Sequence, residues 1–124
     1  MNKYSTYFVD IDGTILMYRE FDTYTTTSPV LTEGSREKLV AIKEAGHKII
    51  LTTARPEYLR GHTENELSDL DVVYDGLVMG IERGPRHLIN DLDPSVEGDR
   101  AFAWNLTRDA GLSTVQVDEV QVED

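Results

Sequence analysis

Two aspartates one residue apart, Asp10 and Asp12, follow a run of apolar and aromatic residues in the stretch YFVDIDGTIL, residues 7–16. In an extended or tightly turning segment, side chains two positions apart lie on the same side, so both carboxylates face one small volume. Two anions that close repel each other unless a cation neutralises them or one keeps a proton. Gly13 lets the backbone approach a tetrahedral anion, and the N–H groups around it can donate to phosphate oxygens. These residues suit attack on phosphorus.

Further hydroxyl and carboxylate groups follow two later apolar segments. Thr52 and Thr53 end the segment 47–54, and Asp91 follows the apolar residues of segment 86–91. In parallel sheets ligands bind beyond the carboxyl ends of the strands, so these groups are expected at one edge with the aspartate pair. An all-oxygen donor set, without Cys or clustered His, favours a hard cation. The sequence therefore predicts a Mg²⁺ site.

The elements that must position these groups alternate between strand and helix along the chain. Ser35 is a candidate N-cap for one helix, Gly46 ends it, and Pro56 suits the first turn of the next. Residues 15–30 indicate a loop or small hairpin. Strands are predicted over residues 5–11, 47–54, 71–79 (one strand or a short pair), 86–91 and 113–122, and helices over 36–45, 56 to about 70, and 99–111.

This alternation predicts an α/β fold in which a doubly wound parallel sheet carries helices on both faces, giving three layers. The 124 residues form one predicted domain, residues 1–124, with an acidic end from about residue 118 that is expected to fray. The chain carries 12 basic and 23 acidic residues, a net charge of -11. Such a charge repels nucleic acid and anionic membranes unless a local basic patch compensates, so a nucleic-acid partner is disfavoured.

The cysteine count and the first residues bear on the compartment. The chain has no Cys, so it has no disulfide framework and no thiolate metal site. The polar start MNKYSTY has no apolar segment long enough for a signal peptide or a membrane span. A cytoplasmic protein with no membrane partner is therefore expected.

Four segments in this order resemble the motifs of the haloacid dehalogenase-like (HAD) superfamily. DIDGT, residues 10–14, resembles its DxDGT signature, and IILTTAR, residues 49–55, resembles its second motif. RGPRHLINDLD, residues 83–93, resembles the basic third motif followed by the acidic fourth. The match covers roughly residues 7–110. It implies a Rossmann-like fold, a Mg²⁺-dependent phosphatase and, given the short intervals between motifs, a domain without a cap.

The resemblance also implies roles for individual residues. Asp10 would be the nucleophile that forms an aspartyl-phosphate, and Asp12 the general acid and then the base. The Asp10 carboxylate, the Asp12 backbone carbonyl and Asp91 would hold the metal, and Thr53 would hydrogen-bond the transferring phosphoryl group. The remaining candidates for substrate binding are Gly13, Thr14, Ala54 and Arg55. For Arg55, pairing with surface acids is the favoured alternative.

The basic third motif, usually Lys, has two candidates here, Arg83 and Arg86. Arg86 lies five residues before Asp91, about 16 Å along an extended strand, and would enter the site from the wrong end. Arg83 lies on a segment that could loop back to the site. We therefore slightly prefer Arg83 and keep both as catalytic candidates.

The function predicted from these observations is hydrolysis of a phosphate monoester on a small phosphorylated metabolite, either a sugar phosphate or a nucleotide. An open site without a cap also suggests a homo-oligomer in which a neighbouring subunit encloses the substrate, as in capless sugar-phosphate phosphatases. Two alternatives stay open. One is a non-catalytic phosphate-binding, metal-binding or regulatory module with the same fold, and the other is a polynucleotide-end phosphatase.

Overall fold

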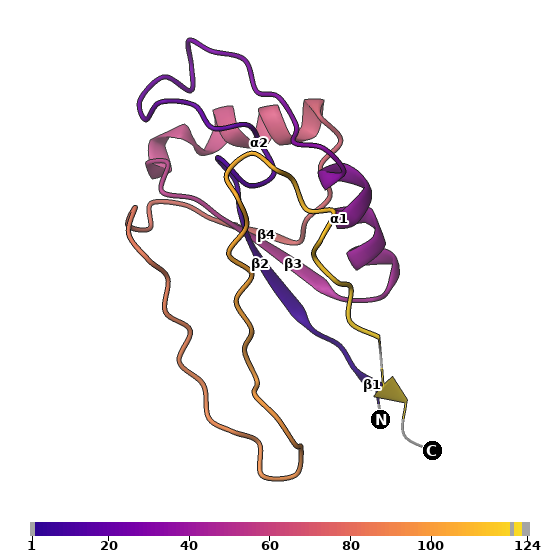
Figure 1. The fold of residues 1–124 in the computed structure, drawn as a ribbon. Coiled ribbons are helices and arrows are strands. Elements are labelled where there is room, and N and C mark those ends of the chain that lie inside the picture. The colour runs from indigo at the N-terminus through magenta and orange to yellow at the C-terminus, as the bar shows by residue number, and fades with distance from the viewer. Residues whose placement is uncertain (1, 120, 123–124) are drawn as a thin grey trace.

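The computed structural model of the protein describes residues 2–119 and 121–122, and its centre is a three-stranded parallel sheet in the order β2-β3-β4 (Figure 1). The strands of this sheet are β2 (Thr6–Asp10), β3 (Lys48–Thr52) and β4 (Gly76–Val78). The helical segments between them are α1 (Ser35–Glu44), the 3₁₀ turn η1 (Glu57–Leu59) and α2 (Arg60–Asp69). A separate antiparallel pair joins β1 (Asn2–Lys3) to β5 (Gln121–Val122).

One face of the parallel sheet carries the hydrophobic core. Val9, Leu51 and Leu77 are register partners across the three strands, and they pack with Leu39 of α1 and Leu67 of α2. Both helices therefore cover the same face, as two successive right-handed crossovers between neighbouring parallel strands require. The α/β class with a parallel sheet is confirmed.

The opposite face of the sheet differs from the prediction. Phe8 is 56% exposed and Val78 is 45% exposed, and no helix of the described residues covers them. The expected third layer is missing because the segments that were predicted to complete the sheet and to add a further helix do not fold as such.

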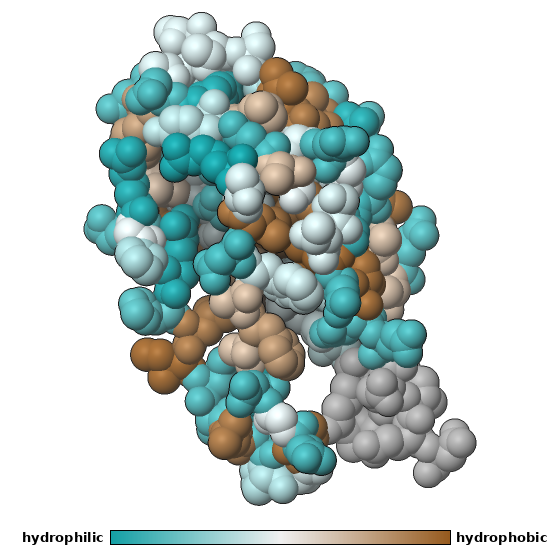
Figure 2. All heavy atoms as spheres, in the orientation of Figure 1, coloured by the Kyte–Doolittle hydropathy of each residue, from teal (hydrophilic) through white to brown (hydrophobic). Residues whose placement is uncertain are grey.

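Residues 82–106 form one long loop, and the part of it farthest from the sheet stands away from the body of the molecule (Figures 1 and 2). The predicted strand 86–91 has no partner strand, and Ile89 is 93% exposed. The predicted helix 99–111 is also absent, with Phe102 and Trp104 exposed. A strand needs a neighbouring strand, and a short helix needs a surface on which to pack its apolar face, so local sequence pattern alone stabilises neither.

The ends of the first helix were predicted in part. Gly34, in the left-handed conformation, is the N-cap of α1, and Ser35 is already its first residue. The Ser35 hydroxyl is buried and hydrogen-bonds Thr32 instead of capping the helix. Gly46 follows the helix with a φ of +98°, as predicted for a helix end.

The predicted loop or small hairpin is a flap, residues 17–30, that is closed at its base. Met17 N donates to Val30 O at 2.7 Å, and Thr32 N donates to Ile15 O at 2.9 Å. Neither this interval nor the one between β3 and β4 holds a cap domain in the part of the chain that the structure describes.

The segment 107–119 returns over the body rather than forming the long last strand that was predicted over 113–122. The part of the predicted strand that does form a strand is β5, and it pairs with β1 rather than with the parallel sheet. Val120 lies outside the described residues. The Lys38 ammonium donates to Val115 O, and Tyr7 Oη donates to Gln116 O at 3.1 Å. Of the acidic end, Asp118 accepts a hydrogen bond from Ser5, and residues 123–124 lie outside the described residues.

No helix among the described residues combines the length and apolar character that crossing a bilayer would require.

Gly111, in the returning segment, is expected to tolerate no side chain. Its φ is +86°, and a Cβ there would overlap the Glu33 carbonyl oxygen. Gly111→Ala should lower the free energy of unfolding by about 1–2 kcal/mol for the left-handed backbone, plus about 1–3 kcal/mol for the overlap. Urea unfolding measures the change. Gly98→Ala is the matched control, because Gly98 also has a positive φ but a Cβ there meets no atom within 4 Å. Equal losses in the two variants would contradict the overlap.

Candidate active site

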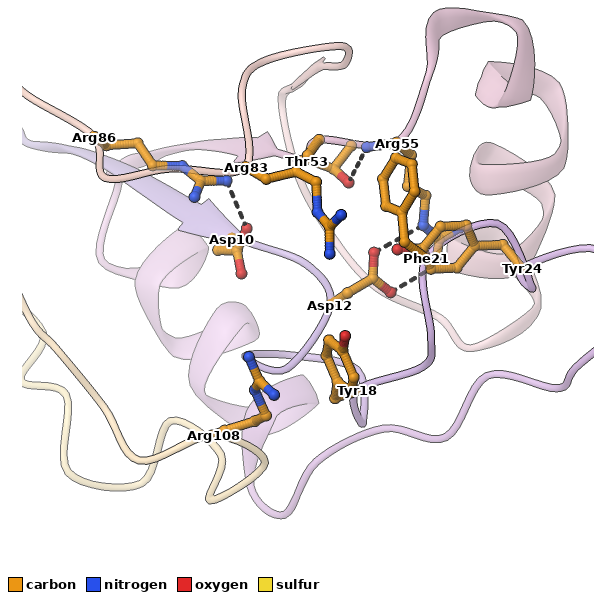
Figure 3. A pocket seen from close by; sticks show the side chains of 11 residues that line it. Asp10, Asp12, Tyr18, Phe21, Tyr24, Thr53, Arg55, Arg83, Arg86 and Arg108 are labelled. Atoms are coloured by element: carbon orange, nitrogen blue, oxygen red, sulfur yellow. Dashed lines mark hydrogen bonds and ion pairs between the residues drawn. The ribbon is translucent and has the colours of Figure 1, made fainter.

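The paired aspartates lie at the mouth of a pocket of about 200 Å³ beyond the carboxyl end of the parallel sheet (Figure 3). Asp10 is the last residue of β2, and Asp12 lies in the turn that follows. Besides them, the pocket is lined by four arginines, three aromatic residues and the end of the second strand, namely Arg55, Arg83, Arg86, Arg108, Tyr18, Phe21, Tyr24, Thr53 and Ala54. The sheet edge thus gathers carboxylates and guanidinium groups in one hollow.

Asp10 has the surroundings of an accessible and partly desolvated carboxylate. Its side chain is 37% exposed, Thr14 Oγ1 donates to its Oδ2 at 3.1 Å, and Arg86 Nη2 donates to its Oδ1 at 3.1 Å. Burial raises the pKa of Asp10, and the Arg86 charge and the Thr14 hydrogen bond offset only part of that rise. The negative charge of Asp12 adds to the rise.

Arg55 holds the second aspartate in a bidentate ion pair. Arg55 Nε donates to Asp12 Oδ2 at 2.9 Å and Arg55 Nη2 donates to Asp12 Oδ1 at 2.8 Å. Such parallel contacts are the strongest arginine–carboxylate geometry. The expectation that Arg55 pairs with surface acids is wrong in one respect, because its side chain is fully buried and its partners are Asp12 and Glu66. Arg55 fixes the direction of the Asp12 carboxylate.

Glu66 of α2 joins two buried arginines beneath the pocket. Its Oε1 accepts from Arg55 Nη1 at 2.9 Å and from Arg19 Nη2 at 2.8 Å, and its Oε2 accepts from Arg19 Nη1 at 3.0 Å. His62 Nε2 lies 3.1 Å from Glu66 Oε2. Burial raises the pKa of Glu66, but the hydrogen bonds from Arg19 and Arg55 outweigh it and hold that pKa below its usual value. The flap, through Arg19, and the Asp12 side chain are therefore both tied to one carboxylate.

The turn after β2 differs from the expected phosphate cradle. Gly13 has a φ of +87°, which explains the glycine, but its N–H donates to Leu16 O at 2.7 Å. The N–H of Thr14 donates to Ile11 O at 3.1 Å. Neither N–H is left for a phosphate oxygen, because both bonds stabilise the turn itself. Thr14 serves the site through its hydroxyl, which contacts Asp10.

Thr53 and Ala54 reach the pocket wall as predicted for residues that end the second strand. Thr53 N donates to Val78 O at 3.0 Å, and Thr53 Oγ1 accepts from Arg55 N at 3.1 Å. Because the oxygen accepts that bond, the Thr53 hydroxyl proton stays available for an acceptor in the pocket.

Both candidates for the basic motif line the pocket, and the reasoning that preferred Arg83 is wrong. Arg86 does not lie on a strand that runs toward Asp91, so the distance along such a strand does not apply. Its guanidinium reaches Asp10 directly. Arg83 points toward the centre of the pocket with its Cζ 4.5 Å from the centre of the Phe21 ring (Figure 3).

The third carboxylate is not brought to the pair. Asp91 lies on the long loop, exposed, and pairs with Arg100, and Asp93 begins a turn by accepting hydrogen bonds from Ser95. Within residues 2–119 and 121–122, no three acidic or His side chains form a group that could hold a metal ion. A magnesium ion fits the described donors only in part, through the Asp10 carboxylate, which lines the pocket. Both side-chain oxygens of Asp12 accept from Arg55, whereas the predicted ligand at this residue, its backbone carbonyl, stays a prediction.

Sequence reasoning missed several residues of the site. Tyr18, Phe21 and Tyr24 come from the flap, where MYREFDTY is an unusually aromatic and charged segment. Arg108 was placed in a helix that does not form, and Glu66 was placed in a helix without a role. The aromatic residues of the flap could have been found from composition. Arg108 and Glu66 could not, because they contact residues far away in the sequence, Tyr18 and Arg19.

Comparison of this chain with known proteins finds similar proteins among solved structures only. No family model matches the chain, and no curated protein matches it. A chain in the structure of the Pnkp1/Rnl/Hen1 complex is 26% identical with a TM-score of 0.56, over 67% of this chain and 30% of that one. A chain in the structure of the Pnkp1/Rnl/Hen1 RNA repair complex gives the same identity, TM-score and coverage of this chain, and 28% of its own length. This chain therefore spans less than a third of the length of each of these two chains.

Proposed function

We propose that this chain is a phosphomonoesterase of the HAD-like type, in which Asp10 carries the phosphoryl group as an aspartyl-phosphate. One observation carries the proposal: an accessible carboxylate at the end of β2 lies in a pocket lined by four arginines. Phosphoryl transfer places negative charge on three equatorial oxygens, and fixed cations stabilise that charge. The first two motif segments, DIDGT and IILTTAR, and the similarity to chains of an RNA repair complex support the same reading.

The proposed reaction has two displacements at phosphorus. An ionised Asp10 oxygen attacks, a P–O bond to Asp10 forms, and the ester P–O bond breaks as the leaving oxygen takes a proton. Water then attacks the aspartyl-phosphate, gives up a proton, and releases inorganic phosphate and free Asp10. Arg86, which contacts Asp10 in the free protein, is placed to transfer its hydrogen bond to a phosphoryl oxygen. The Thr53 hydroxyl can donate to another.

Asp12 is the proposed proton donor and acceptor for these steps. Both of its oxygens accept hydrogen bonds from Arg55 in the described arrangement. Proton transfer therefore requires one oxygen of Asp12 to turn away from Arg55 toward the leaving group, while the second contact keeps the carboxylate oriented.

A polynucleotide end is the substrate class that the observations favour, and a small phosphorylated metabolite is the second candidate. The net charge of -11 was expected to repel a nucleic-acid strand. The arginines, however, gather at the pocket, and a local cluster of cations overcomes an unfavourable total charge at short range. The similar structures belong to an RNA repair complex, which favours the same class.

Magnesium stays part of the proposal. Asp10 would hold the ion together with water and the substrate phosphate, a manner of binding that magnesium commonly adopts. When bound, magnesium supplies positive charge to the phosphoryl oxygens.

We also propose that the protein forms a homo-oligomer. Light scattering after size-exclusion chromatography measures its molar mass directly.

Hydrolysis of a generic aryl phosphate and of a terminally phosphorylated oligonucleotide, with and without magnesium, tests the proposed function. Phosphate release should occur for both, stop after EDTA treatment and return with added magnesium. Silence across both substrates, together with measurable binding of inorganic phosphate, would favour a non-catalytic phosphate-binding module. The third motif has Arg in place of the usual Lys, and Asp91 of the fourth motif lies away from the pocket, which both favour that alternative.

Arg86→Gln is expected to move the acidic limb of the pH profile of kcat/KM to higher pH. The positive charge of Arg86 lowers the pKa of Asp10, so its removal raises that pKa further. Because the attacking Asp10 must be ionised, a higher pKa means that activity falls at a higher pH on acidification. The normalised profile of wild type and variant gives the shift. Arg60→Gln, an exposed site outside the pocket, should leave the limb in place, and an unmoved limb in Arg86→Gln would contradict the contact.

A further inference from the structure

Two arginine–aromatic pairs flank the pocket on opposite sides, and we call them the rim pairs. Arg83 Cζ lies 4.5 Å from the centre of the Phe21 ring, and Arg108 Cζ lies 4.0 Å from the centre of the Tyr18 ring. Figure 3 shows Arg108 and Tyr18 on one side of the Asp10–Asp12 pair, with Arg83 and Arg86 on the other. The rim pairs thus extend the pocket beyond the carboxylate that is proposed to react.

The charges of the rim pairs are not compensated by carboxylates. Among the described residues, Arg55 pairs with Asp12 and Glu66, and Arg86 pairs with Asp10, whereas no carboxylate of that part of the chain pairs with Arg83 or Arg108. In a chain with a net charge of -11, carboxylates that could pair with them are abundant. Two uncompensated cations that face one pocket favour an anionic ligand there.

Arg108 is held in place by the catalytic turn. A Cβ at Gly13 would lie 3.3 Å from Arg108 Cγ, so the arginine stem packs directly against this glycine. The next residue secures the contact, because Asp109 N donates to Gly13 O at 2.8 Å and Asp109 Oδ1 accepts from Tyr18 N at 2.6 Å. The Arg108 stem and the Tyr18 backbone are therefore tied to the turn that follows Asp10, while the Arg108 side chain stays exposed to a ligand.

The positions of Arg86, which pairs with Asp10, and of the uncompensated Arg108 indicate a ligand with more than one anionic group. Arg86 marks the place of the reacting phosphoryl group, since it contacts Asp10. Arg108, on the other side, is left for a second anion. A sugar monophosphate brings a single phosphate, so it would leave Arg108 without an anionic partner. A nucleic-acid strand brings a diester phosphate and a base on every nucleotide.

We propose, on the basis of the proposed function, that the rim pairs are a subsite for the second nucleotide of a single-stranded polynucleotide, which a phosphodiester joins to the nucleotide that carries the terminal phosphate. Arg108 binds the adjoining phosphodiester, and Tyr18, with Phe21 and Arg83 opposite, stacks on an unpaired base. Guanidinium contacts to phosphate and aromatic stacking on bases are the usual combination in proteins that bind single strands. In a duplex, the neighbouring base pairs stack on both faces of that second base, so a blunt duplex end is a poor ligand.

The test compares kcat/KM for terminally phosphorylated substrates of one, two and four nucleotides. Wild type should gain on the order of tenfold from one to two nucleotides or more, because each stacked base adds affinity. Arg108→Gln and Phe21→Leu should each reduce this gain to about twofold or less. Lys48→Gln, at the opposite end of β3, removes one charge outside the pocket and should keep the wild-type gain. Thermal unfolding verifies that each variant is folded.

Direct binding gives a second measurement that does not depend on turnover. In an Asp10→Asn background, fluorescence anisotropy with a labelled four-nucleotide strand should show weaker binding for Arg108→Gln. The slope of log affinity against log salt should also fall by about 0.7, the value for one lost phosphate contact. A longer labelled strand annealed to its complement should bind more weakly than the same strand alone.

The outcomes separate the subsite from the proposed function. Asp10-dependent hydrolysis that is equal for one, two and four nucleotides would overturn the subsite and leave the phosphatase proposal standing. A length gain that Arg108→Gln and Phe21→Leu both retain would also overturn it. No Asp10-dependent hydrolysis of any substrate would instead remove the proposed function, and strand binding that Arg108→Gln weakens would then support the subsite alone.

Discussion

Asp10→Asn is expected to reduce phosphate release by at least about 10³-fold, which is the largest kinetic effect that the site predicts. A neutral amide is a poor nucleophile and cannot form the aspartyl-phosphate. The substitution keeps the size of the side chain. The amide oxygen can still accept from Arg86, and the Thr14 hydroxyl can turn to accept from the amide nitrogen, so the fold should survive. Initial rates on an aryl phosphate and on a phosphorylated oligonucleotide measure the loss.

Asp69→Asn is the matched control for this experiment. Asp69 is exposed near the end of α2 and does not line the pocket, so its amide should keep wild-type rates. Acid quenching of the wild-type reaction, followed by mass spectrometry, should find a phosphoryl group on the peptide that contains Asp10. Substantial activity in Asp10→Asn, or a phosphoryl group on another peptide, would exclude Asp10 as the nucleophile.

Glu66→Gln is expected to lower the free energy of unfolding by about 3–5 kcal/mol, because it leaves the buried Arg19 and Arg55 with Asp12 as their one remaining carboxylate partner among the described residues. Arg55 is fully buried and Arg19 is 8% exposed, and Glu66 accepts hydrogen bonds from both. Equilibrium urea unfolding at neutral pH measures the loss. Glu64→Gln, on the exposed side of the same helix, should change stability by well under 1 kcal/mol.

The effect of Glu66 should also depend on pH with a definite sign. Its pKa in the folded protein lies below the usual value, so its contribution to stability is present above about pH 4.3 and is lost as pH falls through the folded value. The difference between wild type and Glu66→Gln should therefore shrink in acid. A difference that stays constant from neutral to strongly acidic pH would contradict the buried ion pairs.

The residues that strands deliver to the sheet edge could be predicted from the sequence. Asp10 and Thr53 follow short apolar segments whose length and β-branched composition indicate buried strands, and the structure places them at one pocket. The apolar, β-branched pattern of such a buried strand is local, so it can be recognised without knowledge of which strands lie beside it. The alternation of strands and helices likewise gave the parallel α/β core, because two crossovers of ordinary length permit little else.

The features that could not be predicted from the sequence are those that depend on contacts between distant segments. The segment 86–91 has the composition of a strand, but whether it pairs depends on a neighbour that no local pattern names. Glu66 resembles any charged residue of a surface helix until Arg19 and Arg55 surround it. Arg108 meets Tyr18 across 90 positions, and no periodicity records such a pairing.

The bond between Asp109 and Gly13 sets when the site can first exist during synthesis. The turn that carries Asp12 is held by a residue made almost a hundred positions later, and two residues further on Gly111 lies directly against the Glu33 carbonyl. Contacts between such remote positions form late, since the intervening chain must first be ordered. A ribosome-bound chain that has not yet exposed residue 111 should therefore contain both aspartates and still lack an organised pocket.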